Sequence, residues 1–242
     1  MEVDIRPVGD RAVTIVFGNR IAEEIGEEVA RTRSCLSKKS IPGVREYVQT
    51  YASLMVHYDP LVIGYEELCQ LLKESLAGME GQEIERQRKT ILIPVCSGGE
   101  YGPDLDFVCT HTGLPMEEVV RLHSSVDYRI YMLGFLPGFV YLGGMDPSLS
   151  TPRLKSPREK VPSGAVGIAG GQTGIYPMVS PGGWQLIGRT PLKLYDPERE
   201  EAILYEPGDF IRFVPISTDE FASLQRQVEE GTYDYGQVVR GE

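Results

Sequence analysis

The chain is poor in the residue types that mark exported, disulfide-bonded and metal-binding proteins. It has only four cysteines in 242 residues, and no two of them form a C-x-x-C pair. In a chain without an export signal, such cysteines are expected to be reduced thiols in or near the protein core. The three histidines show no metal-binding spacing either, so no metal site is expected. The cysteines are Cys35, Cys69, Cys96 and Cys109, and the histidines are His57, His111 and His123.

Long apolar runs are also missing. No stretch approaches the roughly 20 consecutive apolar residues that a membrane-spanning helix needs. Residues 1–7 show neither the basic region nor the apolar run of a signal peptide. We therefore expect a cytoplasmic protein that does not associate with a membrane.

Positive charge is scarce, because 24 Lys and Arg residues face 35 Asp and Glu residues, for a formal net charge of −11. A nucleic-acid-binding protein needs a Lys and Arg footprint on the phosphate backbone, so nucleic acid is not an expected partner. The sequence also lacks a G-x-x-x-x-G-K-[ST] phosphate-binding loop. The glycine-rich run 167–174 leads into Ile-Tyr-Pro rather than a helix. This run is either a tight barrel turn or a loop that cradles a nucleotide.

Strand and helix patterns alternate in the first ninety residues. Apolar and β-branched side chains predict strands at 12–17, 44–50, 53–58 and 89–95. Apolar residues at helical spacing predict one helix capped by Asn19 and a second over 65–76. The order β-α-β-β-α-β is the signature of a ferredoxin-like unit. We therefore predict a ferredoxin-like domain over residues 1–88, with the polar stretch 78–89 near its boundary.

The pattern changes beyond residue 94. Short helices are predicted at 104–110 and 115–123, and a last helix at 219–229. Between residues 127 and 215, Gly and Pro interrupt short apolar runs every few residues, which is typical of a β-barrel or sandwich. The predicted fold class is α+β, and the second domain, residues 89–242, is predicted to contain the β-structure and a C-terminal helix.

A series of motifs in the second domain carries a family resemblance. In chain order the motifs are PVC (94–96), GGEYGPDL (98–105), RLHSS (121–125), YMLGFLPGFVYLG (131–143), TPR (151–153), SPR (156–158), VPSG (161–164), GIA (167–169), QTGIYP (172–177) and SPGGWQLIGRTP (180–191). Together they closely resemble the family of the B subunit of bacterial 5-oxoprolinase (PxpB), also known as the kinase inhibitor KipI or allophanate hydrolase subunit 1. The likeness extends weakly to VGDRA (8–12), so it covers nearly the whole chain. Ser97, Lys160 and Ala165 depart from the family's usual tyrosine, arginine and serine.

The resemblance implies a fold, a reaction and partners. The implied fold is an α+β N-terminal domain followed by a cyclophilin-like β-barrel. The implied activity is that of a non-autonomous component of ATP-dependent 5-oxoprolinase, which hydrolyses 5-oxo-L-proline to L-glutamate. The C subunit of 5-oxoprolinase is the implied direct partner and the A subunit completes the hetero-oligomer, with ATP as co-substrate on this chain or on a partner.

Three other functions are weighed against this one. A KipI-type inhibitor would bind a sporulation sensor histidine kinase, and an allophanate or urea amidolyase-type enzyme would use a different amide substrate. A peptidyl-prolyl isomerase is suggested by the barrel alone and is not favoured, because fold does not carry function and the motifs of true cyclophilins are not present.

Three residues are candidates for catalysis of lactam opening, which needs a base and cations to neutralise phosphoryl charge. His123 ends a predicted helix and has an ordinary pKa near neutral pH, so it is either a general base or a structurally satisfied histidine. Arg153 and Arg158 lie on a loop that Pro152 and Pro157 stiffen. These arginines are either held ready for a carboxylate or phosphate or simply solvated.

Aromatic residues on the Gly- and Pro-rich loops are candidates for substrate binding. They either wall a small-molecule pocket or an interface, or they plug the barrel ends. Two polar residues are expected in the same groove, Gln172 and Arg189. The predicted substrate-binding residues are Phe135, Tyr141, Gln172, Tyr176, Trp184 and Arg189.

Overall fold

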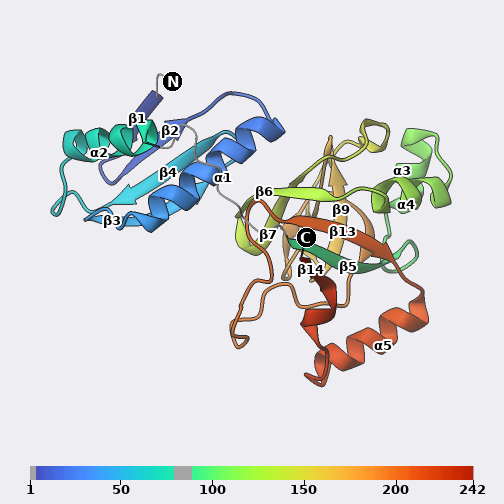
Figure 1. Cartoon of the computed structure of the whole chain (residues 1–242). Coiled ribbons are helices and arrows are strands. Elements are labelled where there is room, and N and C mark those ends of the chain that lie inside the picture. Colours follow the sequence, from blue (N-terminus) through green and yellow to red (C-terminus); the bar gives the residue numbers. More distant parts are fainter. Residues whose placement is uncertain (1–3, 79–88, 242) are drawn as a thin grey trace. The chain divides into compact units, whose positions relative to one another are not determined.

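The structure is a computed structural model that describes residues 4–78 and 89–241. The chain divides into two compact units, residues 1–86 and residues 87–242 (Figure 1). Apart from its two end residues, the predicted boundary stretch 78–89 lies outside the described residues. Within the described ranges, no helix is both long enough and apolar enough to cross a membrane. All four cysteines are free thiols, as predicted.

The first unit is a four-stranded antiparallel sheet with two helices packed on one face. The strand order is β1 (Asp4–Val8), β2 (Ala12–Val16), β4 (Ser53–Tyr58) and β3 (Val44–Gln49). The helices are α1 (Glu23–Lys38) and α2 (Tyr65–Ala77). Their apolar faces and alternate residues of β2 and β4 form one core, which includes Val13, Ile15, Val29, Leu36, Leu54, Val56, Leu68 and Leu72.

The predicted ferredoxin-like order of this unit is not confirmed. The strand predicted to complete it, at 89–95, is β5 (Lys89–Ser97) and belongs to the sheet of the second unit. The edge beside β2 is taken instead by β1, which was not predicted. Only Ile5 in β1 is even half-buried, and Arg6 and Pro7 follow it. Such an edge strand shows no apolar alternation that would reveal it.

The start of α1 also differs from the prediction. Ala22, not Asn19, occupies the N-cap position, and its side chain makes no capping hydrogen bond. Glu23 and Glu24 lie in the first turn, where carboxylates interact favourably with the positive end of the helix dipole. Charge therefore stabilises this helix start in place of a polar cap.

The second unit is a mixed sheet that closes almost into a barrel, consistent with a cyclophilin-like barrel. Its strands follow the order β10-β9-β12-β5-β13-β6-β7, and β14 also pairs with β5. The end strands β7 and β10 lie side by side. All pairings are antiparallel except β5 with β13. The bounds are β6 (Tyr128–Gly134), β7 (Leu136–Gly143), β9 (Ala165–Ala169), β10 (Gln172–Ile175), β12 (Gln185–Arg189), β13 (Phe210–Pro215) and β14 (Val239–Gly241).

Smaller elements complete this unit. Strands β8 (Arg158–Val161) and β11 (Ser180–Gly182) form a separate two-stranded sheet. The three predicted helices are present as α3 (Leu105–Thr112), α4 (Met116–Ser124) and α5 (Thr218–Glu229). Figure 1 shows α3 and α4 next to each other and α5 apart from them. Two short 3-10 helices are η1 (Pro147–Leu149) and η2 (Tyr235–Val238).

The glycine-rich run 167–174 forms the β9–β10 hairpin. Gln172 pairs with Ala169, which leaves Gly170 and Gly171 as a two-residue turn. The φ angle of Gly170 is +57°, a conformation that glycine adopts without steric cost. The tight-turn interpretation is therefore confirmed.

Both faces of the barrel sheet carry apolar side chains. In β7, Val140 and Leu142 belong to the large interior core, whereas Phe139 and Tyr141 belong to or pack on a second cluster. Residues of β9 divide between the same two clusters. Because successive side chains of a strand point to opposite faces, the second cluster lies on the outer face of β7, β9, β10 and β12.

His123 closes one end of the barrel interior. Its ring stacks on Phe213 of β13 at a centroid distance of 4.5 Å, and its Nε2 lies 2.8 Å from Oγ1 of Thr173 in β10. The Thr173 hydroxyl donates to the carbonyl of Gly167 at 3.1 Å, so its oxygen accepts a hydrogen bond from Nε2–H of the imidazole. Burial lowers the pKa of His123 from 6.5 to about 3. The residue is therefore a neutral structural donor.

Acid is expected to destabilise the second unit through His123. The unfolded chain takes up a proton on this residue near pH 6.5, whereas the folded chain stays neutral down to about pH 3. Because the unfolded state binds more protons in this window, the free energy of unfolding falls as the pH falls, by up to ~1.4 kcal/mol per pH unit. We expect a His123→Gln variant to lose this part of the slope in urea unfolding, followed by the fluorescence of Trp184, the only tryptophan.

The matched control is His111→Gln, which changes an exposed histidine of α3. Its unfolding free energy should depend on pH as that of the unaltered chain does. If His123→Gln keeps the full slope, other groups govern the acid sensitivity of the barrel.

Candidate functional site

Four aromatic side chains gather on the outer face of the barrel sheet. The ring of Phe139 makes T-shaped contacts with Tyr141, Tyr176 and Trp184 at centroid distances of 5.1, 5.6 and 5.9 Å. Tyr176 and Trp184 also contact each other at 6.2 Å. Three of the rings are buried and Tyr141 is half-buried. We refer to these four residues as the aromatic cluster.

Glycines in the motifs create the space for these rings. Gly167 and Gly174 are paired across β9 and β10, and a Cβ on either would lie 3.1 Å from an atom of Trp184. A Cβ on Gly182 would lie 2.4 Å from the Tyr176 hydroxyl oxygen. The aromatic cluster can therefore pack closely against the sheet only because these positions lack side chains.

Arg158 is committed to an ion pair beside the cluster. Its guanidinium donates to the Asp104 carboxylate at 2.6 Å and to the Trp184 carbonyl at 3.3 Å. The other carboxylate oxygen of Asp104 accepts from the backbone N–H of Leu186 at 2.6 Å. Only 29% of the Arg158 side chain and 12% of the Asp104 side chain are exposed. This pair thus joins β8, β12 and the start of α3, and the Asp104 carboxylate already neutralises the positive charge of Arg158.

Arg153 differs, because its charge is not matched. The residue is exposed, and its guanidinium carbon lies 6.0 Å from the centre of the Trp184 ring. No carboxylate of the described residues lies within ion-pair distance of it. The Gln185 side-chain N–H donates to the carbonyl of Pro152 at 2.8 Å and so fixes the backbone next to Arg153. The site therefore offers one cation that is positioned and free for an anion.

Electrostatics around Tyr176 show that both arginines act on the cluster. Burial raises the pKa of the Tyr176 hydroxyl. A hydrogen bond from the Trp184 backbone and the charges of Arg153 and Arg158 oppose this rise in pKa. The hydroxyl stays protonated at neutral pH and lies within the field of two guanidinium groups.

Phe135 adds an exposed ring at the rim of the cluster. It lies in the turn between β6 and β7 with a φ angle of +65°, and 63% of its surface is exposed. Its ring contacts Phe139 edge-on at 5.3 Å. A bulky residue in the left-handed region costs about 1–3 kcal/mol, and such strain is concentrated at functional sites. The turn thus holds an apolar ring in solvent next to the cluster.

The structure brings together most but not all of the predicted site residues. Arg153, Arg158, Tyr141, Tyr176 and Trp184 form one group, with Phe135 at its rim. Gln172 starts β10 next to the hairpin turn and is half-buried. His123 lies in the barrel interior, and Arg189 faces a cavity beside α5, so neither joins the aromatic cluster.

Phe139, one of the aromatic residues beside the Gly- and Pro-rich loops considered for the site, is at the centre of the ring contacts. Two further residues of the site, Asp104 and Gln185, are not among the predicted ones. Asp104 pairs with a residue 54 positions later, and Gln185 holds a carbonyl 33 positions earlier. No local sequence pattern indicates contacts over such separations.

Comparisons with known proteins agree with this architecture. The family model described as carboxyltransferase domain, subdomain C and D, matches residues 3–205. The B subunit of 5-oxoprolinase from Bacillus subtilis (strain 168) is 39% identical over 233 residues, which cover 92% of this chain and 97% of that protein.

Solved structures show the same fold within longer chains. The protein TTHA0988 is 39% identical with a TM-score of 0.76, over 86% of this chain and 40% of that one, so this chain spans two-fifths of its length. The urea carboxylase of Kluyveromyces lactis is 20% identical with a TM-score of 0.78, over 99% of this chain and 24% of that one, which shows the fold alone. The family match over most of the chain and the nearly full-length similarity to the Bacillus protein show that this chain belongs to the family of the 5-oxoprolinase B subunit.

Proposed function

We propose that this chain is a non-autonomous component of an ATP-dependent 5-oxoprolinase, which hydrolyses 5-oxo-L-proline to L-glutamate together with the A and C subunits. The observation that carries the proposal is Arg153, an exposed guanidinium held over Trp184 with no carboxylate partner among the described residues. It stands in a chain that is 39% identical to a 5-oxoprolinase B subunit over nearly its full length.

The chemistry of the substrate matches this face of the barrel. 5-Oxo-L-proline is a flat five-membered lactam with one carboxylate. A guanidinium presents a planar fork of donors that suits a carboxylate or a phosphoryl group. Aromatic rings beside it provide the apolar wall that a small ring needs. In the proposed complex, Arg153 binds the substrate carboxylate, and the aromatic cluster with Phe135 lines the space for the lactam ring.

A lactam is resonance-stabilised, so water opens it at neutral pH only after activation. Transfer of the γ-phosphoryl group of ATP to the amide oxygen turns the lactam into a good electrophile. The glycine-rich run 167–174 is a hairpin turn and not a phosphate-binding loop. We therefore assign the ATP site to a partner polypeptide, which also fits a chain that functions within a complex.

The base that activates water is also assigned to a partner. His123 is buried and neutral, with its Nε2–H donated to Thr173. Both carboxylate oxygens of Asp104 are occupied, one by Arg158 and one by the Leu186 N–H. Neither His123 nor Asp104 is free to activate a water molecule on the outer face, so we assign this base to a second polypeptide.

Reconstitution tests the proposed function directly. We expect no glutamate from 5-oxo-L-proline and ATP with this chain alone, and ATP-dependent glutamate release from its mixture with the A and C subunits. Product is measured by an amino-acid assay, and omission of each protein in turn is the control. If the full mixture releases no glutamate, the proposal is contradicted. Turnover of allophanate instead of 5-oxo-L-proline favours the urea amidolyase-type alternative.

Substitution of Arg153 and of Arg158 should have different effects, one on catalysis and the other on stability. Arg153→Gln is expected to lower kcat/KM for 5-oxo-L-proline in the reconstituted enzyme by about tenfold to a hundredfold, since hydrogen bonds to a charged group contribute ~1.5–3 kcal/mol. The free energy of unfolding of this variant should stay unchanged, because Arg153 is exposed. Arg158→Gln should instead lower the free energy of unfolding by ~1–3 kcal/mol, since Asp104 loses its partner.

Lys155→Gln provides the matched control, because it removes an exposed cation from the same loop. It should leave both kcat/KM and the unfolding free energy close to those of the unaltered chain. Equal kinetics for the Arg153→Gln and Lys155→Gln enzymes count against a substrate-binding role of Arg153.

A further inference from the structure

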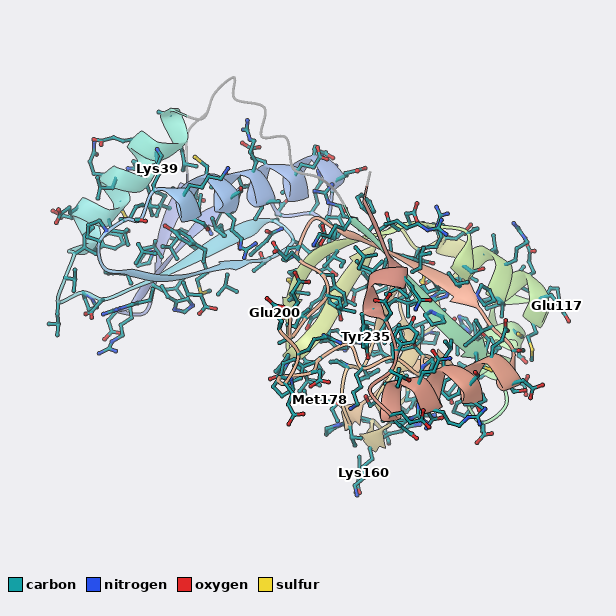
Figure 2. The ribbon with its side chains drawn as sticks, turned by 60° about the horizontal axis from the view of Figure 1, so that its bottom comes forward. Lys39, Glu117, Lys160, Met178, Glu200 and Tyr235 are labelled. Carbon is teal, nitrogen blue, oxygen red and sulfur yellow. The ribbon has the colours of Figure 1, made fainter. Side chains whose placement is uncertain are left out.

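A surface cavity of about 160 Å³ lies between the end of β12 and helix α5. Its lining combines polar residues with three buried apolar ones, Leu192, Phe221 and Val228. Figure 2 shows α5 lying along the barrel unit, and Phe221 and Val228 of this helix form part of the lining. The aromatic cluster contributes no residue to this cavity. It is therefore separate from the proposed 5-oxo-L-proline site.

Arg189 brings a cation to the wall of the cavity. Its Nε–H donates to the carbonyl of Ser163 at 2.9 Å, which orients the half-buried guanidinium. Its two terminal amino groups have no carboxylate within ion-pair distance among the described residues. Lys193 also lines the cavity and is exposed, so a second cation lies near its mouth. This wall is complementary to a carboxylate.

Glu229 of α5 brings a negative charge to the same cavity. Its Oε1 accepts a hydrogen bond from Gln225 Nε2 at 2.8 Å, one turn earlier on the helix. Although Glu229, Arg189 and Lys193 all line the cavity, no ion pair within the described residues joins the acid to either cation. Opposite charges therefore face a common space across a gap rather than neutralising each other.

We propose that this cavity binds a small zwitterionic α-amino acid with a short apolar side chain. The ligand's carboxylate binds Arg189, its ammonium group binds Glu229, and its side chain packs on Leu192, Phe221 and Val228. A ligand with only one charge would leave the opposite protein charge without a partner. The site does not depend on the proposed lactam hydrolysis.

The cavity volume fits this class of ligand. A closed cavity of about 150 Å³ takes a molecule the size of benzene. This cavity is of similar volume and opens where Lys193 and Glu229 are exposed, so polar ends of a ligand can extend to its mouth. The isopropyl group of L-valine is smaller than benzene and leaves room for both charged groups.

Three matched ligands test the proposal on the full chain by ligand-observed NMR titration. L-Valine carries both charges, 3-methylbutanoate lacks the ammonium group, and L-valinamide lacks the carboxylate. We expect L-valine to bind about tenfold or more tightly than either analogue, because each loses one charge-assisted hydrogen bond. Arg189→Gln should weaken L-valine and 3-methylbutanoate but not L-valinamide, and Glu229→Gln should weaken L-valine and L-valinamide but not 3-methylbutanoate.

Lys160→Gln is the matched control, because Lys160 of β8 is exposed and extends away from the ribbon (Figure 2). It should leave all three affinities unchanged, and Trp184 emission verifies that each variant is folded. Three outcomes overturn the proposal: no binding of L-valine, affinities that neither Arg189→Gln nor Glu229→Gln changes, or 3-methylbutanoate binding as tightly as L-valine. The last result would identify a plain anion site.

Discussion

The alternation of side chains across the barrel strands is the constraint on which the rest of this structure depends. Strands β7, β9 and β12 contribute apolar residues to both faces of one sheet. The inner residues fill the barrel and supply stability, as in any closed sheet. The outer residues would be costly to expose, so they are covered by aromatic rings and by the segment that carries β8 and β11. The candidate functional face is thus built on the same backbone as the core.

Asp104 makes this outer layer part of the fold rather than an addition to it. One carboxylate oxygen receives the Leu186 backbone N–H and the other receives Arg158. Because Arg158 also donates to the carbonyl of Trp184, the residue just before β12, the acid fixes the backbone that carries the largest ring of the aromatic cluster. A half-buried pair of this kind keeps its geometry when solvent is replaced by a ligand or a partner. Loop 151–157 can therefore place Arg153 on a surface that is already rigid.

Local patterns in the sequence were sufficient to predict most helices and strands, but not to predict which sheet each strand joins. The helices of the barrel unit and the β9–β10 turn follow from apolar spacing and glycine chemistry, and the structure confirms them. The ferredoxin-like order is not confirmed because residues 89–95 read as a strand in either domain, and strand pairing is a long-range property. Edge strand β1 was missed since an exposed edge requires no apolar alternation.

The candidate site shows the same division between local and long-range information. Gly and Pro motifs indicated where rings and arginines would gather, because such loops have few conformations. The predicted site roles of His123 and Arg189 rested on residue type alone. His123 has the chemistry of a base, yet its ring is buried against Phe213 and Thr173. Arg189 has the chemistry of an anion binder, and the end of β12 directs it to the cavity beside α5. Burial and direction, which decide both roles, are not encoded in neighbouring residues.

The free charge of Arg153 gives a physical reason for the proposed chain to act together with a partner. A cation on an aromatic surface binds an anion weakly when water competes on all open sides, since the interaction falls as the local dielectric constant rises. Covering that surface with a second polypeptide excludes water and strengthens the same contact without any change in this chain. The exposed ring of Phe135, held at an unfavourable φ angle, supplies apolar area that favours such covering. In the proposed function, binding of a partner and tight binding of a small anion would therefore be one event on this face of the barrel.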